Sequence, residues 1–183
     1  MAQQFPELLD RHQQFIQDQK IFFVGTATAD GRINLSPKGM DSLRVIDKTT
    51  VVWLNVTGSG NETSAHVQEM PRMTIMFAAF EGKPLILRLY GNARVIHKKD
   101  PGWETHYSLF NPTAGARQIF NLSIDLVQTS CGMAVPYFDY VGERTLLTDW
   151  AEKKGEEGLK DYWKDKNQQS LDGKPTHIMS KNT

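Results

Sequence analysis

The sequence predicts a mainly β fold with flanking helices, in which an antiparallel sheet curls until it closes. Strand-like segments follow one another as hairpins instead of alternating with long helices, and this order favours an antiparallel sheet. The two clearest helical patterns lie toward the ends, at about residues 6–19 and 150–166. A length of 183 residues suits one compact core, so we expect residues 1–183 to form a single domain.

The chain is expected to begin with an amphipathic helix and a hairpin. Apolar residues recur at helical spacing over residues 6–19, and Pro6 suits a first helical turn. The β-branched and aromatic segment Ile21–Thr28 then precedes Asp30-Gly31, a strong signal for a type I′ turn, and Arg32–Ser36. These two segments predict a β-hairpin.

A third strand leads into a glycine-rich loop and a short helix. Val51–Val56 has the composition of a strand and ends at Thr57-Gly58-Ser59-Gly60. Asn61–Gln68 is expected to be helical, because Ser59 and Glu62 fit a capping box. Strand, loop and helix start therefore arrive in sequence.

The second half of the chain predicts another hairpin, a further strand and a terminal helix. Met73–Phe80 and Leu85–Ile96 form two long strand patterns joined by a polar turn. A mixed helical region is expected over 97–121, and Ser123–Val135 alternates as a strand does. Trp150–Lys166 is a charged helix with an apolar docking face, and the last dozen residues are expected to be a loose tail.

Composition argues against several partners. Lys plus Arg and Asp plus Glu both number 21, so no global field favours nucleic acid or an acidic membrane surface. The single cysteine, Cys131, can form neither an internal disulfide nor a thiolate cluster by itself, and the histidines lack metal-ligand spacing. These patterns predict no metal site. The polar start and the lack of a long apolar run predict a cytoplasmic protein without a membrane partner.

The loop after the third strand has the chemistry of a phosphate site. Thr57, Ser59 and Thr63 offer hydroxyls, the two glycines let backbone N–H groups approach an anion, and the helix start adds a favourable dipole. The same residues also suit an ordinary capped turn, and the loop alone leaves the two readings equal. It lacks the third glycine of a dinucleotide fingerprint and the lysine of a P-loop.

Several polar and basic residues outside the loop are further candidates. Asn34, Ser36 and Lys38 alternate and so share one face of an extended strand, which either lines a ligand site or faces water at a sheet edge. Arg72 and Arg88 would matter if they pointed inward, since a guanidinium pairs well with phosphate.

Four motifs together resemble the pyridoxamine 5′-phosphate oxidase-like family of flavin mononucleotide (FMN) proteins. They are Phe22-Phe23-Val24-Gly25-Thr26-Ala27, Asp30-Gly31-Arg32, Asn34-Leu35-Ser36-Pro37-Lys38-Gly39 and Trp53-Leu54-Asn55-Val56-Thr57-Gly58-Ser59-Gly60-Asn61-Glu62-Thr63. The resemblance implies a six-stranded split barrel that forms a homodimer with FMN in clefts built by both subunits. It places Ser36 and Lys38 near the flavin ring or phosphate, Asn55 and Val56 at the ring edge, and Ser59, Asn61, Glu62 and Thr63 on the phosphate side.

Two departures from the family pattern shape the expected function. Asn61-Glu62-Thr63 stands where the true oxidases carry a basic phosphate cluster, so Lys38 or Arg72 is expected to supply positive charge. The C-terminal arginine and histidine signature for pyridoxal phosphate has no counterpart in Asp172–Thr183. We therefore expect an FMN-dependent oxidoreductase that acts on an unidentified small molecule, rather than an authentic pyridoxamine-phosphate oxidase. The alternatives are a non-catalytic flavin-binding or storage protein, and a split barrel that holds haem or deazaflavin.

Overall fold

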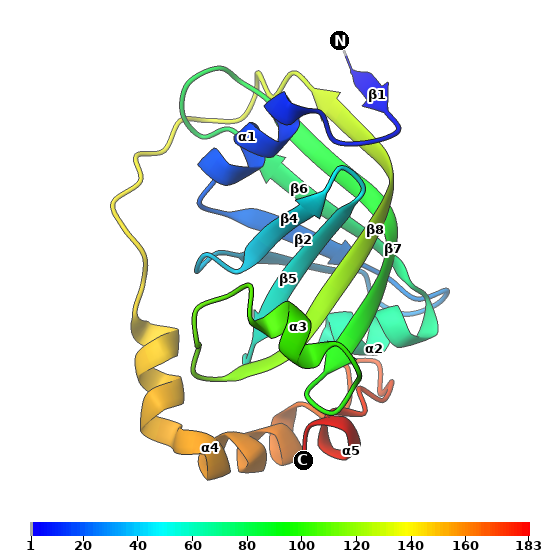
Figure 1. The fold of residues 1–183 in the computed structure, drawn as a ribbon, viewed down its shortest axis with the longest axis vertical. Coiled ribbons are helices and arrows are strands. Elements are labelled where there is room, and N and C mark those ends of the chain that lie inside the picture. The colour runs from blue at the N-terminus through cyan, green and yellow to red at the C-terminus, as the bar shows by residue number, and fades with distance from the viewer. Residues whose placement is uncertain (1) are drawn as a thin grey trace.

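The strands pair into one antiparallel sheet in the computed structural model, which describes residues 2–183 (Figure 1). The strand order is β3-β2-β6-β7-β8-β5-β4, and β1 pairs with β8 beside this path. The strands are β1 (Gln3–Phe5), β2 (Phe22–Thr26), β3 (Asn34–Lys38), β4 (Leu43–Asp47), β5 (Thr50–Val56), β6 (Arg72–Ala78), β7 (Ile86–His97) and β8 (Ala116–Ser130). The helices are α1 (Asp10–Asp18), α2 (Glu62–Glu69), α3 (Trp103–Tyr107), α4 (Leu146–Lys166) and α5 (Ile178–Asn182).

The sheet curls because two strands that are neighbours in the chain lie at its opposite edges. Only residues 39–42 separate β3 from β4, yet these strands stand at the two ends of the strand order. Register shifts in the β4–β5, β5–β8 and β7–β8 pairs let the strands bend. Gly91 lies at the β7–β8 shift, where a Cβ atom would overlap the carbonyl oxygen of Ser123. The result is a split barrel.

Alternate residues of the strands point into the main apolar core, while the other faces of β5 and β8 pack with α3 in a second apolar cluster. Met73, Ile75 and Phe77 of β6 are buried, with the residues between them less so. Trp53 of β5 and Phe120 of β8 stack with ring centroids 4.9 Å apart. Below the barrel, α4 and α5 form their own small cluster from Ala151, Leu159, Trp163 and Ile178 (Figure 1). None of the helices in residues 2–183 is both long and apolar enough to cross a membrane.

Most of the expected elements are confirmed. Both hairpins form, as β2–β3 and β6–β7, and the helix after the glycine-rich loop is α2. The type I′ turn expected at Asp30-Gly31 does not form, because residues 27–33 join β2 to β3 and only Gly31 of the two has a positive φ. The mainly β split-barrel fold is also confirmed, but the sheet has eight strands where six were expected. The two additional strands are β1 and β4, which are short and lie at or beside the sheet edges.

Several boundaries in the first two thirds of the chain were wrong. The first helix begins at Asp10 rather than at residue 6, because Gln3–Phe5 pairs with β8. The sixth expected strand starts at Ala116 instead of Ser123, since polar residues at its start are buried by polar partners and hid the apolar pattern. The helical pattern over 97–121 is real only at Trp103–Tyr107.

The C-terminal end is docked, which contradicts the expected loose tail. Residue Ile178 is fully buried, and the side-chain amide of Asn182 donates to the backbone oxygen of Arg117 at 2.6 Å. The terminal helix also begins earlier than expected, at Leu146, and its backbone breaks at Gly155 with φ 65°. The prediction of a loose tail was wrong because the sequence does not show the distant backbone groups to which the C-terminal residues bind.

Candidate functional site

A cavity of about 450 Å³ opens between β3, β5 and the loop that joins β5 to α2. We call this cavity the smaller cavity and the loop, residues 57–61, the polar loop. The volume lies within the range of about 300–1,000 Å³ that small-molecule and cofactor pockets occupy. The lining includes Ser36, Lys38, Asn55, Val56, Thr57, Ser59, Asn61, Glu62 and Thr63, together with Trp53 and Arg117. The structure thus brings together all but one of the site residues predicted from the sequence.

The remaining predicted residue, Arg72, lies away from the smaller cavity. It borders a different hollow between β2, β6 and β7, and its Nε donates to Sδ of Met70 at 3.1 Å. The guanidinium of Arg88 is also engaged elsewhere, donating to Oγ of Ser130 at 3.1 Å. Within one chain, neither arginine supplies charge to the polar loop.

The charge comes instead from Arg117, a residue that the sequence analysis missed. It lies on β8, is only 4% exposed and borders the smaller cavity. Its Nη1 donates to Oδ1 of Asn167 at 2.6 Å, and its Nη2 donates to the backbone oxygen of Gly60 at 2.7 Å. Both acceptors are neutral. Burial lowers the pKa of Arg117 to about 9.

Lys38 is the second cation of the smaller cavity. Its Nζ lies 5.1 Å from the centre of the Trp53 ring, a cation–π distance. Burial, and to a lesser degree the charge of Arg117, lower its pKa to about 8. Within the described residues neither Lys38 nor Arg117 has a carboxylate acting on its pKa. Two partly desolvated cations therefore face one cavity without a compensating anion.

Glu62, the acidic residue that borders the smaller cavity, forms no ion pair with Lys38 or Arg117 within the described residues. Oε2 of Glu62 accepts a hydrogen bond from the backbone N–H of Leu171 at 2.9 Å. The expected capping box between Ser59 and Glu62 does not form, because the N-cap of α2 is Asn61 and no side chain caps the helix. The hydroxyl of Ser59 is exposed at the cavity.

Some polar groups of the site are already occupied. The Thr57 hydroxyl donates to the backbone oxygen of Gly115 at 2.8 Å and accepts from Nε1 of Trp163 at 2.8 Å. Thr57 is fully buried, so it fixes the polar loop rather than presenting a free donor. Oδ1 of Asn61 is buried without a hydrogen-bond partner in the described part of the chain, which is costly unless a ligand or water satisfies it.

The smaller cavity is equipped to hold a highly charged anion. A phosphate monoester carries about −1.5 to −2 charges at neutral pH and three strong acceptor oxygens. Such a group binds donors of the kind found here: Arg117, Lys38, the Ser59 hydroxyl and the backbone N–H groups of the polar loop.

Across residues 2–183, no three His, Cys, Asp or Glu side chains are grouped so that they could hold a metal ion.

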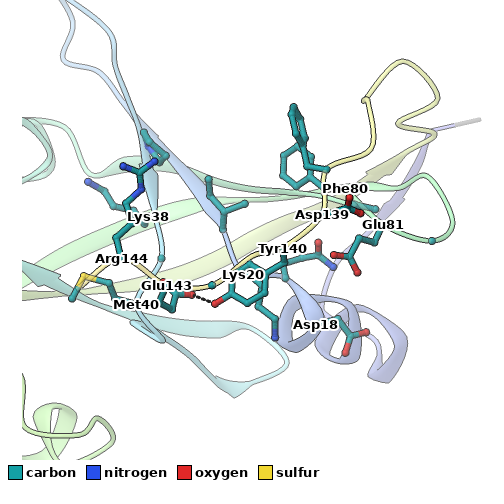
Figure 2. A pocket seen from close by; sticks show the side chains of 18 of the residues that line it. Asp18, Lys20, Lys38, Met40, Phe80, Glu81, Asp139, Tyr140, Glu143 and Arg144 are labelled. Atoms are coloured by element: carbon teal, nitrogen blue, oxygen red, sulfur yellow. Dashed lines mark hydrogen bonds between the residues drawn. The ribbon is translucent and has the colours of Figure 1, made fainter. Parts of the chain in front are cut away.

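A larger cavity of about 1080 Å³ adjoins the smaller one. Both share the wall Pro37–Met40 and Leu147. Figure 2 shows Lys38 and Arg144 at one end of the larger cavity, and Glu81 and Asp139 at the other. The irregular segment before α4 forms one wall, where Tyr140 donates to Glu143 at 2.9 Å and Phe138 packs edge-on against Phe80.

Fold and site define the class of this protein as a split β-barrel with a cation-lined cleft beside a polar loop that leads into α2. Residues 8–131 match the family model for pyridoxamine 5′-phosphate oxidase, and the chain belongs to this family. The family resemblance expected from the four sequence motifs is thereby confirmed.

Individual relatives support the same assignment. The chain is 35% identical over 191 aligned positions to the pyridoxamine 5′-phosphate oxidase family protein ustO of Aspergillus flavus, covering 93% of this chain and 76% of the relative. A crystal structure from Lactobacillus delbrueckii, assigned to the pyridoxamine 5′-phosphate oxidases, has a TM-score of 0.54 and 18% identity over 67% of this chain and 94% of its own. The crystal structure of HupZ from Group A Streptococcus has a TM-score of 0.51 and 17% identity, over 65% of this chain and 91% of its own. These two structures share the fold with our chain.

Proposed function

We propose that this chain binds FMN in the smaller cavity and acts as a flavin-dependent oxidoreductase on a small molecule. The observation that carries the proposal is the pair of uncompensated cations, the buried Arg117 and the half-buried Lys38, in a cavity of cofactor size. Such charges are retained in a protein interior when a ligand of opposite charge completes the site. Membership of the family makes FMN the phosphate-bearing ligand of choice.

Different residues would bind the phosphate and the ring system of FMN. Arg117, Ser59 and the amides of the polar loop would hold the phosphate, while Ser36, Asn55 and Val56 would border the ring system. Lys38 stands on the wall that the two cavities share. When bound, FMN supplies hydride transfer at its N5 position, and the protein supplies placement and electrostatics.

The absorbance spectrum of the purified protein tests FMN binding. We expect a yellow flavin band, or its appearance after reconstitution of the apoprotein with FMN. Lys38→Ala and Ser59→Ala should weaken flavin retention, whereas Lys48→Ala and Ser123→Ala, at exposed positions outside the cavity, serve as matched controls. A protein that takes up no FMN would overturn the proposal. A Soret band or a fluorescent deazaflavin would indicate one of the other cofactors.

Catalytic turnover is the less direct half of the proposal. It is supported by the larger cavity, which offers about 1080 Å³ next to the proposed flavin site for a substrate. Its walls carry Phe80, Phe138 and Tyr140, so the substrate is expected to be amphipathic. Anaerobic stopped-flow mixing with NADH or NADPH should bleach the flavin band. Bound FMN that no donor reduces would favour a flavin-binding or storage role.

We also infer that the protein forms a homodimer. Ile33 is 80% exposed and Leu35 is 66% exposed on and beside the edge strand β3, and an unpaired apolar edge favours association. Light scattering at micromolar concentration should give twice the chain mass of 20.8 kDa. A mass equal to one chain would contradict this inference.

A further inference from the structure

Asn167 connects the C-terminal part of the chain to Arg117 and to the polar loop, two parts of the smaller cavity. It follows the last residue of α4 and is fully buried. Its Oδ1 accepts from Nη1 of Arg117 at 2.6 Å, and its Nδ2 donates to the backbone oxygen of Gly58 at 3.1 Å. Its backbone oxygen accepts from Nδ2 of Asn61 at 3.2 Å. One residue thus fixes the guanidinium and both sides of the polar loop.

Further contacts from the same part of the chain surround this connection. Nε1 of Trp163 donates to the Thr57 hydroxyl at 2.8 Å, and the backbone N–H of Leu171 donates to Glu62 at 2.9 Å. The hydroxyl of Thr176 donates to the backbone oxygen of Asn167 at 2.6 Å. The C-terminal partners in these contacts, Trp163, Asn167, Leu171 and Thr176, all lie beyond residue 131, where the match to the family model ends. The support of the polar loop therefore comes from a part of the chain that the family match does not include.

The neutrality of Asn167 is the chemically important property. A buried arginine is normally paired with a carboxylate, and that pairing would cancel the charge which an anionic ligand needs. Asn167 accepts the same hydrogen bond without a charge, and the second acceptor, the backbone oxygen of Gly60, is also neutral. Arg117 is thereby oriented while its positive charge remains available to the cavity.

We propose that Asn167 is a positioning residue of the anion site, which holds Arg117 and the polar loop in place and, because it is uncharged, keeps Arg117 available for a phosphate group. The proposal rests on the proposed function in that the natural anion is taken to be the phosphate of FMN. It assigns to the C-terminal segment a share in ligand binding, beyond its packing against the barrel.

Three variants of the full chain test this proposal. Asn167→Asp and Asn167→Ala both lose the amide donor to Gly58, but only the aspartate keeps an acceptor for Arg117 and adds a charge beside it. Gln168→Glu changes the net charge equally at the next, exposed residue and is the matched control. The measurements are the dissociation constant for FMN, from quenching of flavin fluorescence, and the melting temperature of each apoprotein in phosphate-free buffer.

The two measurements should rank the variants in opposite orders. Asn167→Asp should melt no lower than Asn167→Ala, because it retains the contact with Arg117 and forms a buried ion pair. Its dissociation constant for FMN should nevertheless rise by at least about 30-fold, because the carboxylate competes with the phosphate for the guanidinium. Asn167→Ala should weaken binding by only about fivefold, the loss of ordinary hydrogen bonds. Gln168→Glu should stay within about twofold of the unaltered protein.

Other outcomes separate this proposal from the proposed function. If Asn167→Asp binds FMN as tightly as Asn167→Ala or more tightly, Asn167 has only a structural role and the positioning proposal is overturned, while FMN binding stands. If the unaltered protein binds no FMN but inorganic phosphate raises its melting temperature with the same order of variants, the cofactor is wrong and the positioning role stands. A protein that responds to neither ligand overturns both.

Discussion

Replacement of Arg117 by methionine removes the charge of the anion site while nearly preserving the length of the side chain. Arg117 is 4% exposed, and its two hydrogen bonds go to neutral acceptors. Loss of hydrogen bonds to a charged group costs about 1.5–3 kcal/mol each, and relief from burying an unpaired cation returns several kcal/mol. We therefore expect Arg117→Met to change the unfolding free energy of the apoprotein by no more than about 2 kcal/mol.

Binding of FMN should suffer far more than stability. Truncating one partner of a buried charge pair costs about 2–5 kcal/mol, which corresponds to a loss of affinity of about 30-fold to several thousandfold. Titration of FMN fluorescence gives the dissociation constant, and urea denaturation of the apoprotein gives the stability. Arg94→Met, at an exposed position of β7, is the matched control and should bind normally. An affinity of Arg117→Met within about threefold of the unaltered protein would refute the assignment of Arg117 to the phosphate.

Three further predictions concern pH, the barrel bend and the polar loop. Because burial first, and neighbouring charge second, lower the pKa of Lys38 from 10.5 to about 8, FMN affinity should fall as pH rises through 8. The stability of the apoprotein should rise between these two pKa values, because the lysine binds more protons in the unfolded chain there. An FMN affinity from calorimetric titration, or a melting temperature, that stays constant from pH 7 to 10 would contradict the corresponding prediction. Gly91→Ala should lower the unfolding free energy in urea by more than about 3 kcal/mol, because its Cβ would overlap the facing β8 backbone. Gly25→Ala should cost under half of that, because its Cβ would meet Leu35 and Thr74 only at ordinary van der Waals distance. Trp163→Phe removes the indole donor to Thr57 and should cost about 1–2 kcal/mol in thermal unfolding, and an unchanged melting temperature would show that this hydrogen bond is unimportant.

The sequence predicted those parts of the fold that depend on local patterns. The hairpin β2–β3 lies where Asp30-Gly31 and the flanking strand patterns indicated, although residues 27–33 form a longer connection than the expected turn. The loop before α2 lies where the glycines indicated. The short edge strands were missed, since β1 and β4 are too brief to show an alternating pattern of their own. Their position is decided by pairing with β8 and β5.

The sequence predicted most of the residues that line the candidate site, but only one of its two cations. Residues of β3 and of the polar loop were found because they follow one another in recognisable motifs. Arg117 was missed, although a charged residue beside Gln118 and before the apolar Ile119 is a signal of a buried polar strand position. Arg72 was expected to supply charge because a guanidinium pairs well with phosphate, but the register of β6 directs it to another hollow. The sequence does not reveal which distant strand supplies a cation.

The contacts between the polar loop and the C-terminal segment also determine when the site can exist during synthesis. Thr57 and Trp163 are 106 positions apart, and Asn167 and Gly58 are 109 apart. Contacts between residues so far apart form late, because a long loop must close first, and a ribosome adds only about 5–20 residues per second. The barrel strands can therefore pair several seconds before the polar loop is fixed. A nascent chain would therefore lack a fixed polar loop until Trp163 and Asn167 had left the ribosome.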